Sequence, residues 1–287
     1  MPFLRKWGSY GSGDGEFEGP IGVTVYENEV FVSDYYTPRI QVFDLAGTFK
    51  RKWGEYGSGD GQFDFPLGVS AYLNEIFVLD SLNNRIQVFD LAGTFKRKWG
   101  EYGSGDGQFA YPSEISIYKN EVIVVDVTNY RIQVFSLAGT FKRKWGSYGS
   151  ADGQFNSPHM ISPYQEEILV TDAYNYRIQV FSLAGTFKRK WGTHGTANGQ
   201  FLYPVGISVY QDKVYVVDIT AHRIQVFDLN GTFKKKWGEY GSGDGDFNQP
   251  YGISTYKGNA YVADSGNNRI QVFSLAAPQH LPIMGIG

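Results

Sequence analysis

Short apolar runs separated by turn-forming residues fill most of the chain. In residues 55–100, a glycine-rich segment ending at Pro66 is followed by three mainly apolar runs at residues 68–72, 75–80 and 85–89 and by the mixed aromatic and basic run 95–99. β-Branched and aromatic residues dominate these runs, and a D-L-A-G-T segment between the last two supplies turn chemistry. The runs are short and show no helical period. The pattern therefore predicts four short antiparallel strands joined by tight turns.

This four-strand pattern repeats along the chain. The 6 tryptophans recur every 46 residues from Trp7 to Trp237, each at the end of a segment similar to F-K-R-K-W. Four short strands per repeat are typical of one blade of a β-propeller. Residues 3–8 form a fourth strand without the preceding three, whereas the last repeat stops after its third strand, residues 269–273. Joining these halves leaves no unpaired edge, so we predict an all-β, six-bladed β-propeller of four-stranded antiparallel blades, closed by residues 3–8.

We expect one domain over residues 1–287. Its blades are predicted at residues 21–54, 67–100, 113–146, 159–192, 205–238, and 251–275 completed by 3–8. Residues 276–287 form an apolar C-terminal tail with two prolines, unlike a solvated terminus. We expect this tail to dock on its own propeller or on a second copy, which would give a homo-oligomer.

A motif in each repeat resembles a known family. Residues 80–89 read D-S-L-N-N-R-I-Q-V-F and follow G-S-G-D-G-Q-F-D-F-P. The pattern D-x-x-N-x-R-I-Q-V-F with G-x-G-D-G-Q-F-x-x-P upstream closely resembles the NHL repeat, and it recurs six times between residues 3 and 275. The resemblance implies a six-bladed propeller, often a scaffold for protein or RNA binding, with a few enzymatic relatives. The sequence departs from the motif at Thr37 and Ala221, which replace Asn, and at Glu114 and Met160, which replace Gly.

An aspartate and an arginine recur five positions apart in every repeat, at the end of the second strand and the start of the third. We expect each pair to form charge-assisted hydrogen bonds across the link between these strands. Sixfold repetition favours an architectural role over catalysis. The pairs are Asp34/Arg39, Asp80/Arg85, Asp126/Arg131, Asp172/Arg177, Asp218/Arg223 and Asp264/Arg269.

Composition narrows the class of protein. The 26 basic residues are balanced by 29 acidic ones, which argues against a generic nucleic-acid binder. The absence of cysteine excludes disulfides, thiol nucleophiles and thiolate zinc sites. No secretory signal and no membrane span is expected, so a cytoplasmic location is the default. Most basic residues lie in the predicted outermost strands, where lysines discourage edge-to-edge aggregation; a polyanion-binding belt is the alternative.

Differences between the otherwise similar blades locate the candidate site. They cluster in the residue pair that follows each connector proline and in the link between the second and third strands. In a propeller both places lie at one rim of the central channel. We expect Thr220 and several of these residues to form one arc of that rim, with tyrosines about the mouth. The candidate binding residues are Tyr35, Tyr36, Ser113, Glu114, Tyr130, His159, Met160, Tyr174, Tyr176, His222 and Tyr251.

The sequence favours a non-catalytic binding or scaffold propeller that presents this rim to a protein, peptide or glycan. The alternative is that the differences between blades arose by neutral drift in exposed loops and have no function. The enzymatic alternative is a metal-dependent lyase or hydrolase, with Glu114 as base and His159 and His222 as metal ligands or acid–base groups. Propellers similar to NHL proteins, such as the peptide-amidating lyase, hold zinc with channel-facing histidines. Three converging imidazoles are not evident here, so we predict no metal, cofactor or catalytic residue. Specific RNA recognition is disfavoured because the divergent positions contain no Lys or Arg.

Overall fold

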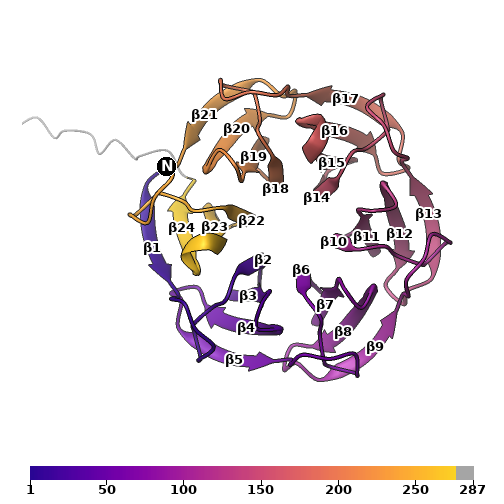
Figure 1. The fold of residues 1–287 in the computed structure, drawn as a ribbon, viewed down its shortest axis with the longest axis vertical. Coiled ribbons are helices and arrows are strands. Elements are labelled where there is room, and N and C mark those ends of the chain that lie inside the picture. The colour runs from indigo at the N-terminus through magenta and orange to yellow at the C-terminus, as the bar shows by residue number, and fades with distance from the viewer. Residues whose placement is uncertain (276–287) are drawn as a thin grey trace, which may run out of the picture.

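The computed structural model describes residues 1–275, which form a ring of six blades around a central channel (Figure 1). Each blade is a four-stranded antiparallel sheet whose strands follow one another from the channel outward. The predicted fold class is confirmed. The predicted tail, residues 276–287, lies outside the described residues.

The strands form four concentric layers. The innermost strands are β2 (Pro20–Tyr26), β6 (Pro66–Tyr72), β10 (Pro112–Tyr118), β14 (Pro158–Tyr164), β18 (Pro204–Tyr210) and β22 (Pro250–Tyr256). The second layer is β3 (Glu29–Asp34), β7 (Glu75–Asp80), β11 (Glu121–Asp126), β15 (Glu167–Asp172), β19 (Lys213–Asp218) and β23 (Asn259–Asp264). The third is β4 (Arg39–Asp44), β8 (Arg85–Asp90), β12 (Arg131–Ser136), β16 (Arg177–Ser182), β20 (Arg223–Asp228) and β24 (Arg269–Ser274). The outermost is β5 (Phe49–Trp53), β9 (Phe95–Trp99), β13 (Phe141–Trp145), β17 (Phe187–Trp191), β21 (Phe233–Trp237) and β1 (Phe3–Trp7).

Blades are numbered here by chain order, so that blade 1 is β2–β5 and blade 6 is β22–β24 with β1. The 3-10 turns η1 (Ala173–Asn175) and η2 (Ser265–Asn267) lie between the second and third strands of blades 4 and 6. Strand β1 pairs antiparallel with β24, with Arg5 opposite Val272 and Trp7 opposite Ile270. The expected closure of the ring by the N-terminal strand is confirmed.

The hydrophobic core lies between neighbouring blades. One cluster joins Val30, Val32 and Phe43 of blade 1 to Tyr261 and Ile270 of blade 6, all fully buried. Burying a side chain of this size stabilises the fold by about 1.5–3 kcal/mol. Since both faces of the second and third strands are covered, apolar residues dominate the middle of these strands, and polar residues there, such as Asp34, Arg39 and Gln41, are buried.

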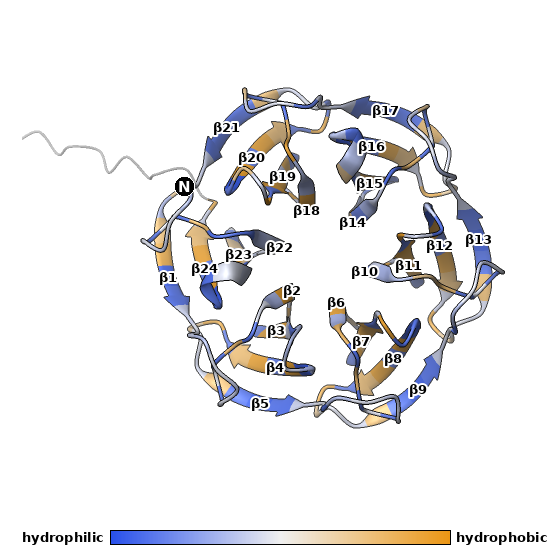
Figure 2. Cartoon of the chain, in the orientation of Figure 1, coloured by the Kyte–Doolittle hydropathy of each residue, from blue (hydrophilic) through white to orange (hydrophobic). Residues whose placement is uncertain are grey.

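The outermost strands alternate between half-buried and exposed residues. In β5, Phe49 and Trp53 are half-buried, whereas Lys50 and Lys52 are exposed. Figure 2 shows these strands as a hydrophilic rim around the hydrophobic third layer. The turn before the outer strand of blades 1 to 5 needs glycine: Gly93 has φ +92°, and a Cβ there would lie 2.6 Å from the Trp53 ring. The tryptophan of one blade therefore packs against the turn of the next.

The innermost strands begin earlier than predicted. Strand β6 starts at Pro66 instead of residue 68, because Pro66 pairs with Asp80 before a bulge and the ladder resumes at Val69. Proline lacks a backbone N–H but is tolerated as the first residue of a strand. Because β6 and β7 are antiparallel, the connector before β6 and the link after β7 lie on the same face of the ring, which we call the top face.

Candidate functional site

The six predicted Asp/Arg pairs are all formed, with each aspartate side chain fully buried. In blade 3, Arg131 Nε donates to Asp126 Oδ2 at 2.7 Å, and its terminal nitrogens donate to connector carbonyls, including that of Ser104 at 2.7 Å. The other Asp126 oxygen accepts the backbone N–H of Ala110 at 2.8 Å. The pair therefore fastens the connector to the blade as well as the strand link.

The asparagine of the repeat, which donates to the aspartate, is replaced by Thr37 in blade 1 and by Ala221 in blade 5. In blade 3 the Asn129 side-chain amide also donates to Asp126, at 2.9 Å. In blade 1 the residue at this position is Thr37, whose hydroxyl donates to Glu18 instead. Burial raises the pKa of Asp34 to about 6, although Arg39 and the backbone of Glu18 donate hydrogen bonds to it.

An aromatic groove of about 660 Å³ lies on the top face over blades 1, 2, 5 and 6. Residues of both divergent sets line it: Tyr35 and Tyr36 from a strand link, and Tyr251 from the pair after a connector proline. Tyr35 packs against the Tyr36 ring and also against Phe65, with centroids 4.7 and 4.2 Å apart. Tyr36 is 68% exposed. The groove is also lined by Tyr10, Glu18, Gly19, Ile21, Leu67, Ile219, Gln249, Ser265, Gly266 and Asn268.

His159 lies between two tyrosines at the channel mouth. Its Nε2 lies 2.8 Å from the Tyr203 hydroxyl, and its Nδ1 lies 3.1 Å from the Tyr251 hydroxyl. Burial lowers the pKa of His159 to about 4, so the imidazole is neutral at physiological pH. A neutral imidazole donates from one nitrogen and accepts at the other. Each ring nitrogen of His159 is therefore hydrogen-bonded to a tyrosine hydroxyl.

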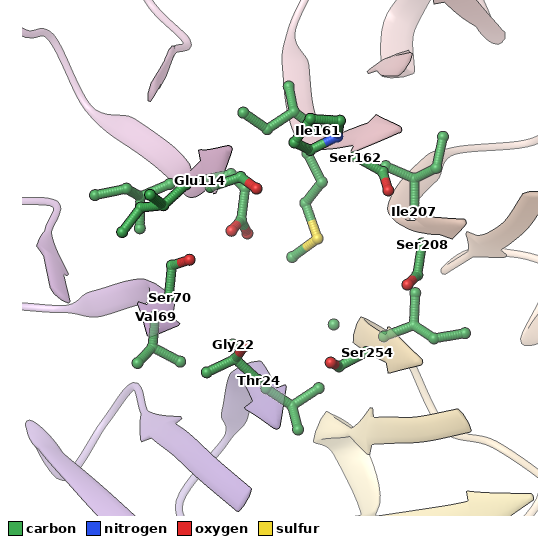
Figure 3. A pocket seen from close by; sticks show the side chains of 18 of the residues that line it. Gly22, Thr24, Val69, Ser70, Glu114, Ile161, Ser162, Ile207, Ser208 and Ser254 are labelled. Carbon is green, nitrogen blue, oxygen red and sulfur yellow. The ribbon is translucent and has the colours of Figure 1, made fainter. Parts of the chain in front are cut away.

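Glu114 and Met160 lie inside the channel. Both line a cavity of about 200 Å³, and Glu114 is its only charged lining residue among residues 1–275 (Figure 3). Burial raises the pKa of Glu114 to about 8, although the backbone N–H of Ile115 hydrogen-bonds to it. The other blades carry glycine at this position: Gly22, Gly68, Gly206 and Gly252.

The remaining predicted residues do not form one surface. Ser113 is buried and donates to the His159 carbonyl at 2.5 Å, which joins β10 to β14. Tyr174, Thr220 and His222 line a separate depression of about 400 Å³ beside the groove. The expected arc of blades 3 to 5 is thus divided among the channel, a blade interface and this depression. Three predicted residues pack against connector rings: Tyr130 on Tyr148, Tyr176 on His194, and His222 on Tyr240.

Sequence reasoning missed the connector tyrosines because they repeat and were assigned to the architecture. They are 64–73% exposed and therefore add to the aromatic surface instead of the core. The sequence does give one indication of their exposure: each of these tyrosines lies beside a glycine and outside any predicted strand. These tyrosines are Tyr10, Tyr56, Tyr102, Tyr148 and Tyr240.

The basic rim is largely neutralised by neighbouring carboxylates. In blade 3, Arg143 lies 2.5 Å from Glu121, and Lys144 lies 2.6 Å from Asp106. The pKa of Glu121 is lowered to about 2, mainly because the Arg143 side chain donates a hydrogen bond to its carboxylate. Equivalent pairs occur in blades 1, 2 and 4. In blade 5 the glutamate is replaced by Lys213.

Within residues 1–275, no three His, Cys, Asp or Glu side chains converge as a set of metal ligands. The same part of the chain contains no helix long and apolar enough to cross a membrane.

The sequence matches the model of a family described as 6-bladed beta-propeller over residues 64–145 and 204–282, more than half of the chain. No curated protein matches this sequence.

Several solved structures share the fold. A structure from a nidogen/laminin complex has a TM-score of 0.65 and 18% identity, over 86% of this chain and 85% of that chain. A protein of unknown function from Bacteroides thetaiotaomicron has a TM-score of 0.70 and 15% identity, over 93% and 74%. A catalytically inactive virginiamycin B lyase from Staphylococcus aureus with quinupristin has a TM-score of 0.62 and 17% identity, over 91% and 85%. At these identities the likeness shows the fold alone.

Proposed function

Because the chain belongs to the 6-bladed β-propeller family, we propose that it is a non-catalytic binding protein whose top-face groove holds a peptide segment of a partner protein. The observation that carries the proposal is the aromatic groove of about 660 Å³, with Tyr35, Tyr36 and Tyr251 in its wall. Its size lies within the range of pockets that enclose a few side chains. Tyrosine offers a large apolar face and a polar tip at small entropic cost, and is enriched among residues that dominate binding energy.

The charges of the groove indicate the chemistry of the segment. Glu18 is the only charged residue in the groove lining within the described part of the chain. We therefore expect an apolar or aromatic anchor between Tyr35 and Tyr251, followed by a Lys or Arg of the peptide near Glu18. A polyanion is a poorer fit to this face, and the rim that would attract one already carries paired carboxylates.

The resemblance to the NHL repeat, whose members are often scaffolds for protein binding, supports the same reading. The nidogen/laminin neighbour comes from a protein complex, which is consistent with binding by this fold. The virginiamycin B lyase neighbour supports the enzymatic alternative. That alternative lacks a set of converging ligands within residues 1–275, since His159 is engaged by Tyr203 and Tyr251.

Selection of peptides from a random display library on the immobilised propeller tests the proposal. Selected peptides should contain an apolar anchor beside a basic residue, and Tyr36→Ala should weaken their binding at least about tenfold, measured by fluorescence anisotropy. Tyr102→Ala is the matched control, because Tyr102 is equally exposed but lies outside the groove. Failure to enrich any peptide, or equal losses in both variants, would contradict the proposal. A glycan that binds in a Tyr36-dependent manner, with no peptide binding, would replace the partner class.

A further inference from the structure

The channel cavity beneath the groove has a lining that the groove proposal does not use. Each blade contributes one hydroxyl at the same position of its innermost strand, and Glu114 adds a single carboxyl. In Figure 3 the Glu114 carboxyl and the Ser208 and Ser254 hydroxyls point toward the same open space. The ring of hydroxyls comprises Thr24, Ser70, Ser116, Ser162, Ser208 and Ser254. None of the residues that line this cavity lines the groove.

Glu114 occupies a position where most blades have no room for a side chain. A Cβ on Gly22, Gly206 or Gly252 would lie 2.2 Å from a carbonyl oxygen of the next blade. In blade 3 the innermost strand accommodates Glu114 by pairing it with Val125, whereas the equivalent residue Gly22 is skipped by the bulge in blade 1. Glu114 is thus part of the β-ladder, whereas Met160, the other larger residue at this position, is skipped as Gly22 is.

The carboxyl has no cationic partner in the structure. No Lys, Arg or His lines the cavity among residues 1–275. The titratable groups around Glu114 are Tyr118 on its own strand, Tyr251 on β22 and the neutral His159 on β14. The lining contributed by β2, β6 and β18 contains none. A half-buried, desolvated carboxyl without a cationic partner favours a ligand that brings a compensating positive charge.

We propose that the channel binds a small alkylammonium ion, with its ammonium group on the Glu114 carboxylate and the hydroxyl ring, and its alkyl part against the aliphatic wall. An ammonium group has three donors, which one carboxylate and neighbouring hydroxyls can accept. The wall is supplied by Met160, Ile117, Ile207 and Ile253. A single negative charge matches a monocation, whereas a divalent metal would retain uncompensated charge.

The wild-type protein alone gives the first test, by calorimetric titration with propylammonium. Since burial raises the pKa of Glu114 to about 8, the carboxyl is ionised at pH 9 and neutral at pH 6. Binding should therefore weaken about ninetyfold between pH 9 and pH 6, if only the ionised form binds. Saturable binding with this pH dependence supports the proposal. No binding at pH 9, or binding that does not change with pH, overturns it.

Variants and analogues then assign the site. Glu114→Gln keeps the shape but removes the charge, and Glu114→Gly restores the residue of four other blades. Both should weaken propylammonium binding at least tenfold, while Glu101→Gln, an exposed connector carboxyl, should leave it unchanged. Propan-1-ol should bind at least tenfold more weakly than propylammonium. Equal binding of the alcohol, or binding of calcium in place of propylammonium, would overturn the proposal.

Discussion

Arg131→Ala tests whether the repeated Asp/Arg pair holds the blades together. Asp126 is fully buried, and the Arg131 guanidinium donates to it and to the carbonyls of Ser104, Gly105 and Gln108 at 2.7–2.9 Å. Removing one partner of a buried pair leaves an uncompensated charge, which costs about 3–5 kcal/mol. The three connector carbonyls lie near the surface, where water can replace the guanidinium, so we expect the total loss to stay within that range.

Guanidinium chloride denaturation at pH 7, followed by tryptophan fluorescence, measures this loss as a lower midpoint. Lys144→Ala is the matched control, because it removes an exposed ion pair with Asp106 in the same blade and should cost no more than about 1 kcal/mol. The pH dependence gives a second readout. Burial already raises the pKa of Asp126, and loss of Arg131 should raise it further. The variant should therefore lose stability as the pH rises and regain part of it on acidification.

The reasoning is refuted if Arg131→Ala and Lys144→Ala lose similar stability at pH 7. A loss that does not decrease on acidification would show that the connector contacts, and not the aspartate, cause the effect.

Two further predictions follow from the repeat. Thr37→Asn supplies the amide that Asp80 and Asp126 receive in their own blades; it should lower the pKa of Asp34 from about 6 and stabilise the protein by about 1 kcal/mol at pH 8, measured by urea denaturation. Since wild type loses stability as the pH rises from about 4 through 6, this gain should vanish at pH 4, and a gain independent of pH would contradict it. Deleting residues 1–8 exposes the edge of β24; it should lower the melting temperature and cause aggregation seen by light scattering, both reversed by a synthetic peptide of residues 1–8, and an unchanged melting temperature would argue against closure by β1.

The repeat made most of the fold predictable. Residues 3–8 form a fourth strand without the preceding three, and the last repeat lacks a fourth strand. Each half would leave an unpaired sheet edge by itself, so the sequence predicts that the two halves pair and close the ring. The start of β6 at Pro66 was not predictable in this way, because proline usually ends a ladder and only the register with Asp80 shows that it opens one. The pairing of Arg131 with Asp126 was predictable, but its contacts with Ser104 and Gln108 depend on how the connector folds back.

The site was less predictable, because its contacts join distant residues. His159 meets Tyr203 and Tyr251, which are 44 and 92 residues away and belong to other blades, so its sequence neighbours gave no sign that its nitrogens are occupied. The channel hydroxyls are not distinguished by differences between blades, because one of them occurs at the same position of every blade.

The glycines of the innermost strands show that a residue that differs between blades can still indicate a functional position. At Gly22, Gly206 and Gly252 the next blade approaches so closely that a Cβ would meet its backbone. Met160 keeps the ordinary bulge at this position of blade 4, whereas β10 pairs Glu114 with Val125, a change of register that sets blade 3 apart. Glu114 therefore places a desolvated carboxyl, with no cationic partner among residues 1–275, in the channel, a cost to stability that the glycine of four other blades avoids. This is the physical reason to regard the channel, as well as the groove above it, as a place where the protein binds something.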